Sequence, residues 1–313
     1  MISAIGIDIG GTNTVVGLVA GSVVLERRVM RTKGATDLDR YVKDIAHIIE
    51  AIALDYPHCN IVGIGIGAPN ADAVSGHIYH PVNLPWKGEV PLTQLLTART
   101  GLRSYLINDA TAAVIGEMRF GNSSNLTDFM VITLGTGIGS GIVANGQLVS
   151  GIGGLAGELG HVIAVPGGRS CSCGRSGCLE TYASATGLVN TAIERVRSGA
   201  DTVLNSKPVM DITAEYVYNA ALAGDAVAIG VFEHTGFILG TTLADVIALL
   251  APQALVFMGG LAHAGDMLLV PVAQAADAGM LKALKGRVAF TRSVLPDSDA
   301  AILGAAQLVF DNR

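Results

Sequence analysis

The sequence predicts an α/β protein built from two similar halves that enclose a cleft. Half of the 313 residues are apolar and only 15% are charged, which is typical of a chain with buried strands covered by helices. Its 40 glycines favour many tight backbone turns. The third observation is an internal repeat, in which a strand, a glycine-rich turn, a returning strand and a hairpin occur twice. A duplication of this kind is expected to make a cleft, with one turn from each half facing the other.

The first copy of the repeat begins the chain. An apolar strand over residues 4–9 contains Asp8 near its end and runs into Gly10-Gly11-Thr12-Asn13. A second strand over residues 14–20 returns at once, and a Gly-Ser turn leads to a third strand over residues 23–28. The first half therefore opens with three strands joined by short turns.

The second copy starts at residues 129–134, an apolar strand that runs into the glycine-rich loop 135–141. Residues 142–144 return and reach Asn145-Gly146, a pair that favours the type I′ hairpin turn, before a last strand over residues 147–150. We therefore expect the same backbone layout in both halves.

Apolar residues at helical spacing and short apolar runs predict the remaining elements. The predicted helices cover residues 37–54, 91–100, 110–120, 183–198, 214–222, 226–250 and 300–310, and further strands cover residues 61–66, 102–107, 254–258 and 288–291. We expect the last helix to pack back on the first half. The predicted domains are therefore residues 1–108 together with about 300–313, a small N-terminal α/β domain, and residues 109–299, a larger α/β domain.

Three of the four cysteines cluster in one short glycine-rich stretch. Cys171, Cys173 and Cys178, with His161 upstream, supply four soft or borderline ligands, a set typical of a closed structural zinc site. The alternative is a disulfide, but Cys59 lies far away in the sequence, so a pair within the cluster would leave an odd thiol behind. The spacing therefore predicts a structural Zn²⁺ held by the histidine and the three clustered cysteines, and metal-bound thiolates fit a reducing compartment.

Two carboxylates, Glu158 and Glu180, flank this cluster. Because four ligands complete the metal shell, their oxygens are not needed as ligands. Glu158 and His161 are three residues apart, so on a helical turn they point roughly the same way. We interpret both carboxylates as hydrogen-bond acceptors that face a polar substrate; the alternative is that they are solvated surface acids.

Two glycine-rich turns are candidate phosphate sites. Asp8 and Gly10-Gly11-Thr12 place a carboxylate, bare backbone amides and a hydroxyl at the end of a buried strand, where the amides can bind phosphate oxygens. The loop 135–141, with Thr136 and Gly137, offers the same chemistry from the second half. Neither turn has the sequence of a P-loop or of a Rossmann turn. One such turn alone could be a tight hairpin, but two in a duplicated frame favour phosphate binding.

Asp109 follows the strand 102–107 and begins a helix, so it could be a helix N-cap, a catalytic base or both. Phosphoryl transfer needs a base near the acceptor hydroxyl and groups that organise the charged phosphates. We assign Asp109 as the base and Asp8 as the group that organises the metal ion and the phosphates.

Three further positions are candidate ligand contacts. Asn83 and Asn108 lie in irregular backbone beside apolar strands, where their amides suit the hydroxyls of a sugar, although Asn83 could equally be a turn residue. Gly259-Gly260 follows a buried strand and would let a nucleotide base or ribose lie against the backbone; a plain helix-start turn explains the pair equally well.

Four motifs together resemble the ROK family of bacterial sugar kinases, and most of all its glucokinases. They are DIGGT at 8–12, LGTGIGSG at 134–141, GELGH at 157–161 and CSCGRSGCLE at 171–180, and the resemblance spans nearly the whole chain. It implies an actin-like ATPase (RNase H-like) fold of two duplicated domains, with Mg²⁺-ATP and sugar bound in the cleft. The implied activity is ATP-dependent phosphorylation of a hexose, most of all glucose, at its 6-hydroxyl.

The resemblance also implies residue roles. Asp109 takes the proton from the sugar 6-hydroxyl, and His161 has two duties, with one ring nitrogen on zinc and the other towards the sugar. The implied hexose contacts are Asn83, Asn108, Asp109, Glu158, His161 and Glu180. The implied phosphate and nucleotide contacts are Asp8, Gly10, Gly11, Thr12, Thr136, Gly137, Gly259 and Gly260. The sequence departs from the family pattern at Leu261, because in many relatives the glycine run that starts at Gly259-Gly260, on the adenosine side of the site, is longer.

Other functions share much of this pattern. Kinases for N-acetylglucosamine, N-acetylmannosamine, fructose or allose have nearly all these motifs, and the phosphoryl donor could be ATP or polyphosphate. A second class is the sugar-responsive repressors, which add an N-terminal helix-turn-helix domain; we expect none here, because the chain starts almost directly at its first strand. The net charge of −6 also argues against a nucleic-acid surface. An inactive sugar sensor is disfavoured by the presence of both Asp8 and Asp109.

The sequence shows no basic-then-apolar secretion signal at its N-terminus. The longest apolar run, residues 236–251, is interrupted by Thr241, Thr242 and Asp245, so we expect no membrane span. The expectation is a cytoplasmic enzyme of carbohydrate metabolism and glycolysis that acts on a hexose and ATP, has no nucleic-acid or membrane partner, and forms a homodimer or homotetramer.

Overall fold

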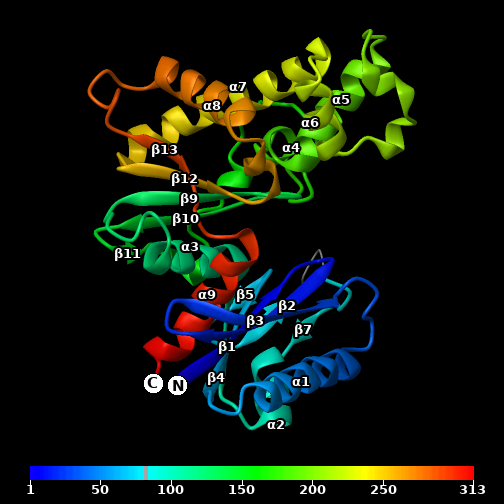
Figure 1. Ribbon diagram of the computed structural model, residues 1–313. Helices are drawn as coiled ribbons and strands as arrows, with labels where there is room; N and C mark the ends of the chain where they lie inside the picture. The colour runs from blue at the N-terminus through cyan, green and yellow to red at the C-terminus, as the bar shows by residue number, and fades with distance from the viewer. Residues whose placement is uncertain (81–83) are drawn as a thin grey trace. The chain divides into compact units, whose positions relative to one another are not determined.

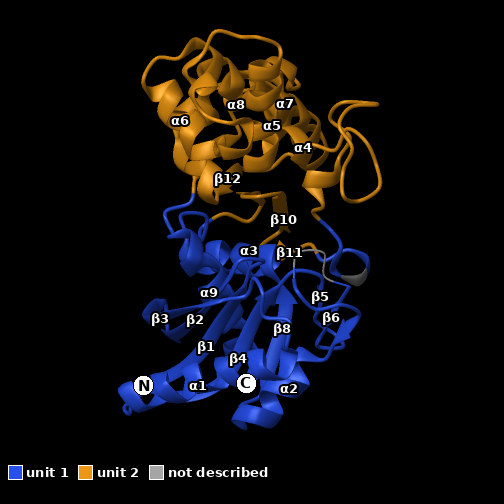
Figure 2. Cartoon of the chain, turned by 90° about the vertical axis from the view of Figure 1, so that its right-hand side faces the viewer, with its two compact units in different colours: residues 1–125, 150–156, 293–313 blue, residues 126–149, 157–292 orange. Residues whose placement is uncertain are grey.

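The computed structural model describes residues 1–80 and 84–313, which fold into two compact units (Figure 2). Unit 1 comprises Met1–Asn125, Ser150–Ala156 and Ser293–Arg313, and unit 2 comprises Leu126–Val149 and Gly157–Arg292. Each unit has its own five-stranded sheet and its own hydrophobic core.

The main sheet of unit 1 has the strand order β3-β2-β1-β4-β8 (Figure 1). Strand β2 is antiparallel to both β1 and β3, whereas β4 is parallel to both β1 and β8. The strands are β1 (Ile2–Ile9), β2 (Asn13–Ala20), β3 (Val23–Arg31), β4 (Asn60–Ala68) and β8 (Ser104–Asn108). A small antiparallel sheet is formed by β5 (Ala71–Asp72), β6 (His77–Tyr79) and β7 (Glu89–Val90).

Helices cover both faces of the unit 1 sheet because side chains alternate along its strands. Ile5 and Ile7 of β1 pack with Tyr41 of α1, whereas Ala4 belongs to a second apolar cluster with Ile302 of α9. The helices of this unit are α1 (Leu38–Asp55), α2 (Leu92–Thr100), α3 (Asp109–Phe120), α9 (Asp297–Asp311) and the short 3₁₀ helix η1 (Ile152–Gly154). Helix α9 packs on β1 and β4, which confirms that the last helix returns to the first half.

The sheet of unit 2 repeats the same plan, with the order β11-β10-β9-β12-β13. Strand β10 is antiparallel to β9 and β11, and β12 is parallel to β9 and β13. The strands are β9 (Phe129–Leu134), β10 (Ile138–Ala144), β11 (Gln147–Leu148), β12 (Ala254–Met258) and β13 (Ala289–Arg292). This identity of order and direction confirms the α/β fold with an internal duplication.

The core of unit 2 is larger and mostly helical. Its α-helices are α4 (Glu180–Ala183), α5 (Ala185–Arg197), α6 (Ala214–Leu222), α7 (Ala226–Leu250) and α8 (Asp266–Gly279). Its 3₁₀ helices are η2 (Leu159–His161), η3 (Val203–Ser206), η4 (Val209–Asp211) and η5 (Gly260–Ala264). Within the described part of the chain, α7 is the one helix long and apolar enough to cross a membrane. Over half of its most apolar window, 56%, is buried in the protein, as in a core helix.

Two features of unit 2 differ from the predicted elements. Helix α8 is not among the predicted helices; Pro271 lies inside it, and an interior proline argues against a helix. Strand β10 begins at Ile138, so the predicted loop 135–141 is a turn only at its start. The reason is that residues 138–141 already pair antiparallel with β9, from Ile138 opposite Leu134 to Gly141 opposite Val131. The Ser140 hydroxyl also donates a hydrogen bond to the Gly157 carbonyl.

The predicted domain boundary between residues 108 and 109 concerns which parts of the chain fold independently, and it stays a prediction. Helix α3 packs against α9, and both belong to unit 1. Limited proteolysis is the measurement that addresses where the folding domains divide.

Candidate functional site

The carboxyl ends of the unit 1 strands bring the predicted acidic residues together. Asp8 of β1 pairs in register with Gly67 of β4, which in turn pairs with Ile107 of β8. Helix α3 begins directly after β8, at Asp109. Gly67 allows α3 to pack closely, because a β-carbon on Gly67 would lie 3.1 Å from the Ala112 β-carbon and 3.4 Å from the Asp109 α-carbon. The start of α3 therefore lies against β4 on the side of Asp8, at the edge of the sheet where α/β proteins bind ligands.

Asp8 and Asp109 interact electrostatically. Burial, and secondly the charge of Asp109, raise the pKa of Asp8 from 3.8 to about 6. The Asp109 side chain also accepts a hydrogen bond of 2.8 Å from the backbone N–H of Ala110 at the positive end of α3. Two neighbouring carboxylates, of which Asp8 has the raised pKa, are typical of a site that binds a cation or transfers a proton.

Asn108, not Asp109, is the N-cap of α3. Its side-chain oxygen accepts a hydrogen bond of 3.2 Å from the Thr111 N–H. The N-cap alternative for Asp109 is therefore wrong, because Asp109 is already the first helical residue. The cap uses the side-chain oxygen of Asn108, which leaves its side-chain NH₂ group as the one suited to a ligand oxygen. The other predicted asparagine, Asn83, lies outside the described residues.

The first glycine turn is held from both sides. The Gly10 N–H donates to the Asn13 carbonyl at 2.9 Å, which closes the turn between β1 and β2. The Thr12 carbonyl accepts from the backbone N–H groups of Thr32 and Lys33, at 2.9 and 3.1 Å. Gly10, Gly11 and Thr12 thus form a fixed backbone turn next to Asp8, as expected for a phosphate-binding turn.

The second glycine turn, in unit 2, lies against Glu180. The Gly135 N–H donates to the Gly137 carbonyl at 3.0 Å, and the Gly135 carbonyl accepts from the N–H of Ala185. A β-carbon on Gly137 would lie 2.9 Å from a carboxylate oxygen of Glu180. The absence of a side chain at Gly137 therefore lets the carboxylate lie directly beside the turn that contains Thr136.

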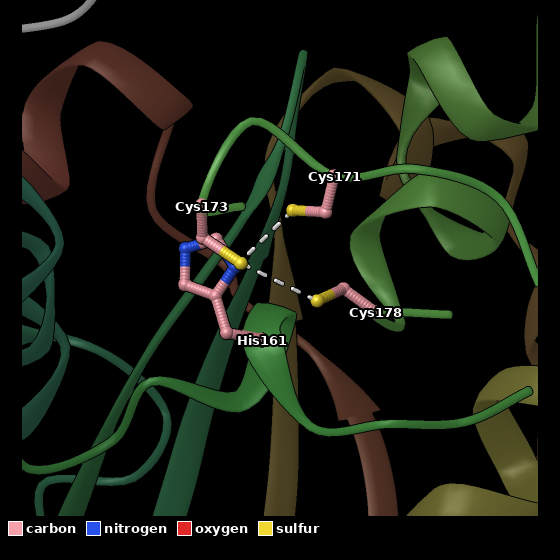
Figure 3. Close-up of side chains that lie close together, drawn as sticks. All are labelled: His161, Cys171, Cys173 and Cys178. Atoms are coloured by element: carbon pink, nitrogen blue, oxygen red, sulfur yellow. Dashed lines mark hydrogen bonds between the residues drawn. The ribbon is translucent and has the colours of Figure 1, made fainter. Parts of the chain in front are cut away.

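The histidine and the three clustered cysteines converge. Figure 3 shows the imidazole and the three sulfurs pointing toward one another from η2 and from the loop that leads to α4. The Cys171 sulfur lies 3.6 Å from the His161 Nδ1 atom, and the Cys173 and Cys178 sulfurs also lie 3.6 Å apart. All four potential ligand atoms lie within 4.8 Å of one another. All four cysteines of the chain are free thiols, so the disulfide alternative is not adopted.

These distances fit a tetrahedral metal site. With Zn–S bonds of about 2.3 Å, the sulfurs around a tetrahedral zinc lie ~3.8 Å apart. The donor set of three thiols and one imidazole is also a zinc set rather than a calcium or magnesium set. Hydrogen bonds from Arg175, chiefly from its backbone N–H, lower the pKa of the Cys173 thiol to about 6. His161, Cys171, Cys173 and Cys178 are thus the residues that could hold zinc.

The two glutamates lie on different sides of the His161 ring. Oε2 of Glu158 lies 4.0 Å from Nε2, the nitrogen that faces away from the sulfurs, whereas Oε1 of Glu180 lies 3.8 Å from Nδ1. The Cys171 thiol also donates to Oε1 of Glu180 at 3.2 Å. The Glu158 side chain is 60% exposed and that of Glu180 only 20%, so Glu158 is the more available of the two.

Arg169 fastens this cysteine loop to α4 and α5. Its Nε and Nη2 atoms donate to the Glu194 carboxylate at 2.9 and 2.6 Å, and Nη1 donates to the Thr181 carbonyl at 2.7 Å. Further bonds reach the Gly187 carbonyl and the Thr191 hydroxyl, which uses all five N–H groups of the guanidinium. Its guanidinium carbon also lies 4.5 Å from the centre of the Tyr182 ring. Sequence reasoning missed Arg169, because none of its partners is close in the sequence.

A cavity of about 510 Å³ lies in unit 2 next to the second glycine turn. Gly135, Thr136 and Gly260 line it, and Tyr218 and Phe232 are two of its aromatic residues, packed edge to face with ring centres 6.1 Å apart. Its remaining lining residues are Ala185, Ala214, Glu215, Asn219, Leu261, His263 and Ala264. The volume suits a small organic ligand, and the lining is mainly apolar. Sequence reasoning reached Thr136 and Gly260 but not α6, whose residues carry no motif.

The candidate residues divide between the two units. Asp8, Gly10, Gly11, Thr12, Asn108 and Asp109 belong to unit 1. Thr136, Gly137, Glu158, His161, Cys171, Cys173, Cys178, Glu180, Gly259 and Gly260 belong to unit 2.

The duplicated sheets, each followed by polar groups at its strand ends, define an actin-like ATPase fold. Residues 4–312 match the ROK family, so the chain belongs to this family. It is 36% identical to a glucokinase of Halalkalibacterium halodurans, over 97% of this chain and 94% of that enzyme. It also resembles the structure of a ROK family glucokinase from Streptomyces griseus in complex with glucose and AMPPNP, with a TM-score of 0.84, 31% identity and 99% of each chain covered.

Two relatives with other functions match a smaller share of this chain. An N-acetylmannosamine kinase of Citrobacter koseri is 32% identical over 85% of this chain and 86% of that enzyme. A putative xylose repressor of a Caldicellulosiruptor species is 31% identical over 85% of this chain but only 67% of the repressor.

Replacing one cysteine of the cluster tests the metal site. We expect the wild-type protein to contain one zinc per chain, and Cys171→Ser to lose most of it, because a serine hydroxyl is a much weaker zinc ligand than a thiolate. Elemental analysis of the purified proteins measures this. Cys59→Ser is the matched control and is expected to keep its zinc, since Cys59 lies outside the cluster. A wild-type protein without zinc would contradict the assignment.

The raised pKa of Asp8 predicts a pH dependence of stability. In the ligand-free protein Asp8 stays protonated up to about pH 6, whereas in the unfolded chain it ionises near 3.8. The folded state therefore binds the extra proton in this window, and its stability decreases as the pH rises through it. We expect Asp8→Asn to remove about 3 kcal/mol of this decrease, since one unit of pKa is about 1.4 kcal/mol and the pKa is raised from 3.8 to about 6.

Urea unfolding at a series of pH values across this window measures the effect. Asp44→Asn, a substitution of an exposed acid on α1, is the control and should leave the slope unchanged. A slope that Asp8→Asn does not alter would contradict the raised pKa.

Proposed function

We propose that the protein is an ATP-dependent hexose kinase that transfers the terminal phosphoryl group of ATP to the 6-hydroxyl of glucose. The observation that carries the proposal is the pairing of Asp8 and Asp109 at the carboxyl ends of β1 and β8, beside a glycine turn. A site for phosphoryl transfer needs a base at the acceptor, a group that organises the metal and phosphates, and backbone donors for the phosphate oxygens. Similarity to glucokinases over nearly the whole chain supports glucose as the acceptor.

Asp109 is the proposed general base. Its position at the start of α3 fixes its backbone, and the packing of that helix against Gly67 limits where its carboxylate can lie. A carboxylate held this way can accept the proton of the sugar hydroxyl as the oxygen attacks phosphorus. The proton therefore moves to Asp109 while the new oxygen–phosphorus bond forms.

The sugar is proposed to bind through amides and carboxylates that match its hydroxyls. Glu158 and Glu180 accept hydrogen bonds from hydroxyls, and the His161 Nε2 atom adds a third polar contact on the side of Glu158. Asn83 and Asn108 are proposed to contribute from the first half of the chain. His161 then has the two duties that the family resemblance implies, with Nδ1 toward the thiols.

The nucleotide is proposed to bind along the two glycine turns and in the unit 2 cavity. Gly10, Gly11, Thr12, Thr136 and Gly137 offer donors to the phosphate oxygens. Asp8 is proposed to hold the Mg²⁺ that accompanies ATP, and this ion neutralises the phosphate charge when it is bound. The adenosine is proposed to lie in the cavity, next to Gly259 and Gly260 and against the apolar lining that includes Tyr218.

Zinc is proposed as a structural ion. A closed set of four protein ligands leaves no open position for a substrate, so the ion would act by fixing the loop between η2 and α4. This loop ends at Glu180, so the ion would hold a proposed sugar contact in place. The proposed setting is the cytoplasm and glycolysis, and a homodimer or homotetramer is the proposed assembly.

The alternative sugar with support from a relative is N-acetylmannosamine. A repressor function is the less favoured class, because the repressor relative is 31% identical over 85% of this chain, whereas the glucokinase relative is 36% identical over 97% of it. A panel of hexoses and N-acetylhexosamines assayed with Mg²⁺-ATP separates these possibilities, and we expect glucose to have the highest kcat/KM.

Removing the proposed base is the direct test of the mechanism. We expect Asp109→Asn to lower kcat by roughly 1,000-fold, within the range that a positioned general base contributes, while glucose binding changes little. Steady-state kinetics and equilibrium binding of glucose measure the two effects. Asp44→Asn serves again as the control acid, and a rate near that of the wild type would remove Asp109 from its role.

Removing an aromatic side chain from the cavity tests the proposed adenosine site. We expect Tyr218→Ala to raise the KM for ATP about tenfold, since aromatic contact with a base is worth about 1–3 kcal/mol, while the KM for glucose stays the same. We expect polyphosphate to be a poor donor, because none of the described residues that line the cavity is a lysine or an arginine that could hold a chain of charges. If polyphosphate is an efficient donor and Tyr218→Ala does not change the rate of this transfer, the proposed adenosine site is contradicted.

A further inference from the structure

Glu117 is a fully buried carboxylate that the proposed mechanism does not use. It lies on α3 about two turns after Asp109. Its Oε1 atom accepts hydrogen bonds from the Ser123 N–H at 3.2 Å and from the Ser123 hydroxyl at 3.0 Å. Its Oε2 atom accepts from the Ser293 hydroxyl at 2.5 Å. One side chain thus joins two segments that are far apart in the sequence.

Both segments are places where the chain leaves or enters unit 1. Unit 1 ends its first stretch at Asn125, two residues after Ser123, and its last stretch begins at Ser293. Both serines are buried, with 1% and 9% exposure, so their bonds to the carboxylate are shielded from water. Glu117 therefore holds these two of the four chain connections at their unit 1 ends.

The chain around the carboxylate is shaped to receive it. A β-carbon on Gly121 would lie 2.2 Å from all three carboxyl atoms of Glu117, so a side chain at position 121 would displace the carboxyl group from its present place. The Gly121 N–H also donates to the Glu117 carbonyl at 2.9 Å and ends the helix there. On the other side, the Ser293 hydroxyl accepts from the Leu295 N–H at 3.1 Å, so its own hydrogen is directed to Glu117.

The two serines that donate hydrogen bonds to Glu117 explain why this position needs a carboxylate. Ser123 and Ser293 both donate to the side chain, and only a residue with two acceptor oxygens serves both. Glutamine has the same shape but one acceptor oxygen, so it must present its NH₂ group to one of the two serines. Because burying a carboxylate costs free energy, a purely structural contact could be made more cheaply by apolar residues.

We propose that Glu117 is a positioning residue for the base Asp109. It fixes the C-terminal end of α3 to both connections, and this prevents the helix from shifting along its axis at the end that carries Asp109. Helix α9 limits sideways movement, since β-carbons on Gly116 and Gly304 would lie 2.0 and 1.7 Å from the backbone of the facing helix. The proposal rests on the proposed function of Asp109, and a small displacement of a base lowers the rate strongly.

The test compares Glu117→Gln, Ser293→Ala and the double variant with Ser3→Ala, which removes a buried hydroxyl of β1 far from α3 in the sequence. We expect Glu117→Gln and Ser293→Ala to lower kcat about tenfold with little change in the KM for glucose or ATP. The double variant should be no slower than Glu117→Gln, because both changes break the same bond. Ser3→Ala should keep the wild-type kcat.

Two results would overturn the proposal. A loss of thermal stability in Glu117→Gln or Ser293→Ala with an unchanged kcat would make the contact structural only, and a rise in both KM values would place the effect on binding. If Glu117→Gln does not fold, Ser293→Ala alone decides by the same criteria. The Asp109→Asn variant separates this failure from a failure of the proposed function. If Asp109→Asn is active, Asp109 is not the base and the proposed function of this residue fails.

Discussion

The burial of Asp8 beside the charge of Asp109 is the constraint on which the candidate site of unit 1 depends. The register of β1, β4 and β8 and the missing side chain of Gly67 bring the two acids close, and partial burial withholds the water that would otherwise screen them. The ligand-free protein therefore carries an unfavourable charge pair at its strand ends. A divalent cation offsets this charge, so the same feature that lowers stability favours the binding of a metal–phosphate ligand.

Unit 2 has the same sheet but a different chemistry at the corresponding edge. There the strand β9 ends in glycines and Thr136, and the acids come from outside the sheet, on the segment that contains η2 and the cysteine loop. This segment is held at several points. His161 and the three cysteines form the thiol cluster, and Cys171 is bonded to Glu180. The guanidinium of Arg169, two residues before Cys171, binds α4 and α5. The duplicated frame thus supplies strand ends, and local loops give each half its own ligands.

The fold was predictable where the signal is local. Alternating and helical apolar patterns located most strands and helices, and the cysteine cluster was visible because its ligands lie within a short stretch of sequence. Helix α8 was not predictable, because Pro271 argues against a helix; the structure accommodates it against Gly236 of α7, whose β-carbon would lie 2.5 Å from the proline ring. Glu117 was not predictable either, since Ser293 is 176 residues away in the sequence.

Arg169 and Glu117 show why polar anchors are used beside these sites. Each uses its full hydrogen-bonding capacity, five donors in one case and two acceptor oxygens in the other, to join segments that the sheet does not connect. Apolar contacts would bury these segments equally well, but such packing tolerates shifts of side chains and backbone. Hydrogen bonds to fixed partners define one position along the chain, because a shifted segment leaves a buried donor or acceptor unpaired. Glu117 belongs to unit 1 and Arg169 to unit 2, so the precision of each half depends on an anchor of its own.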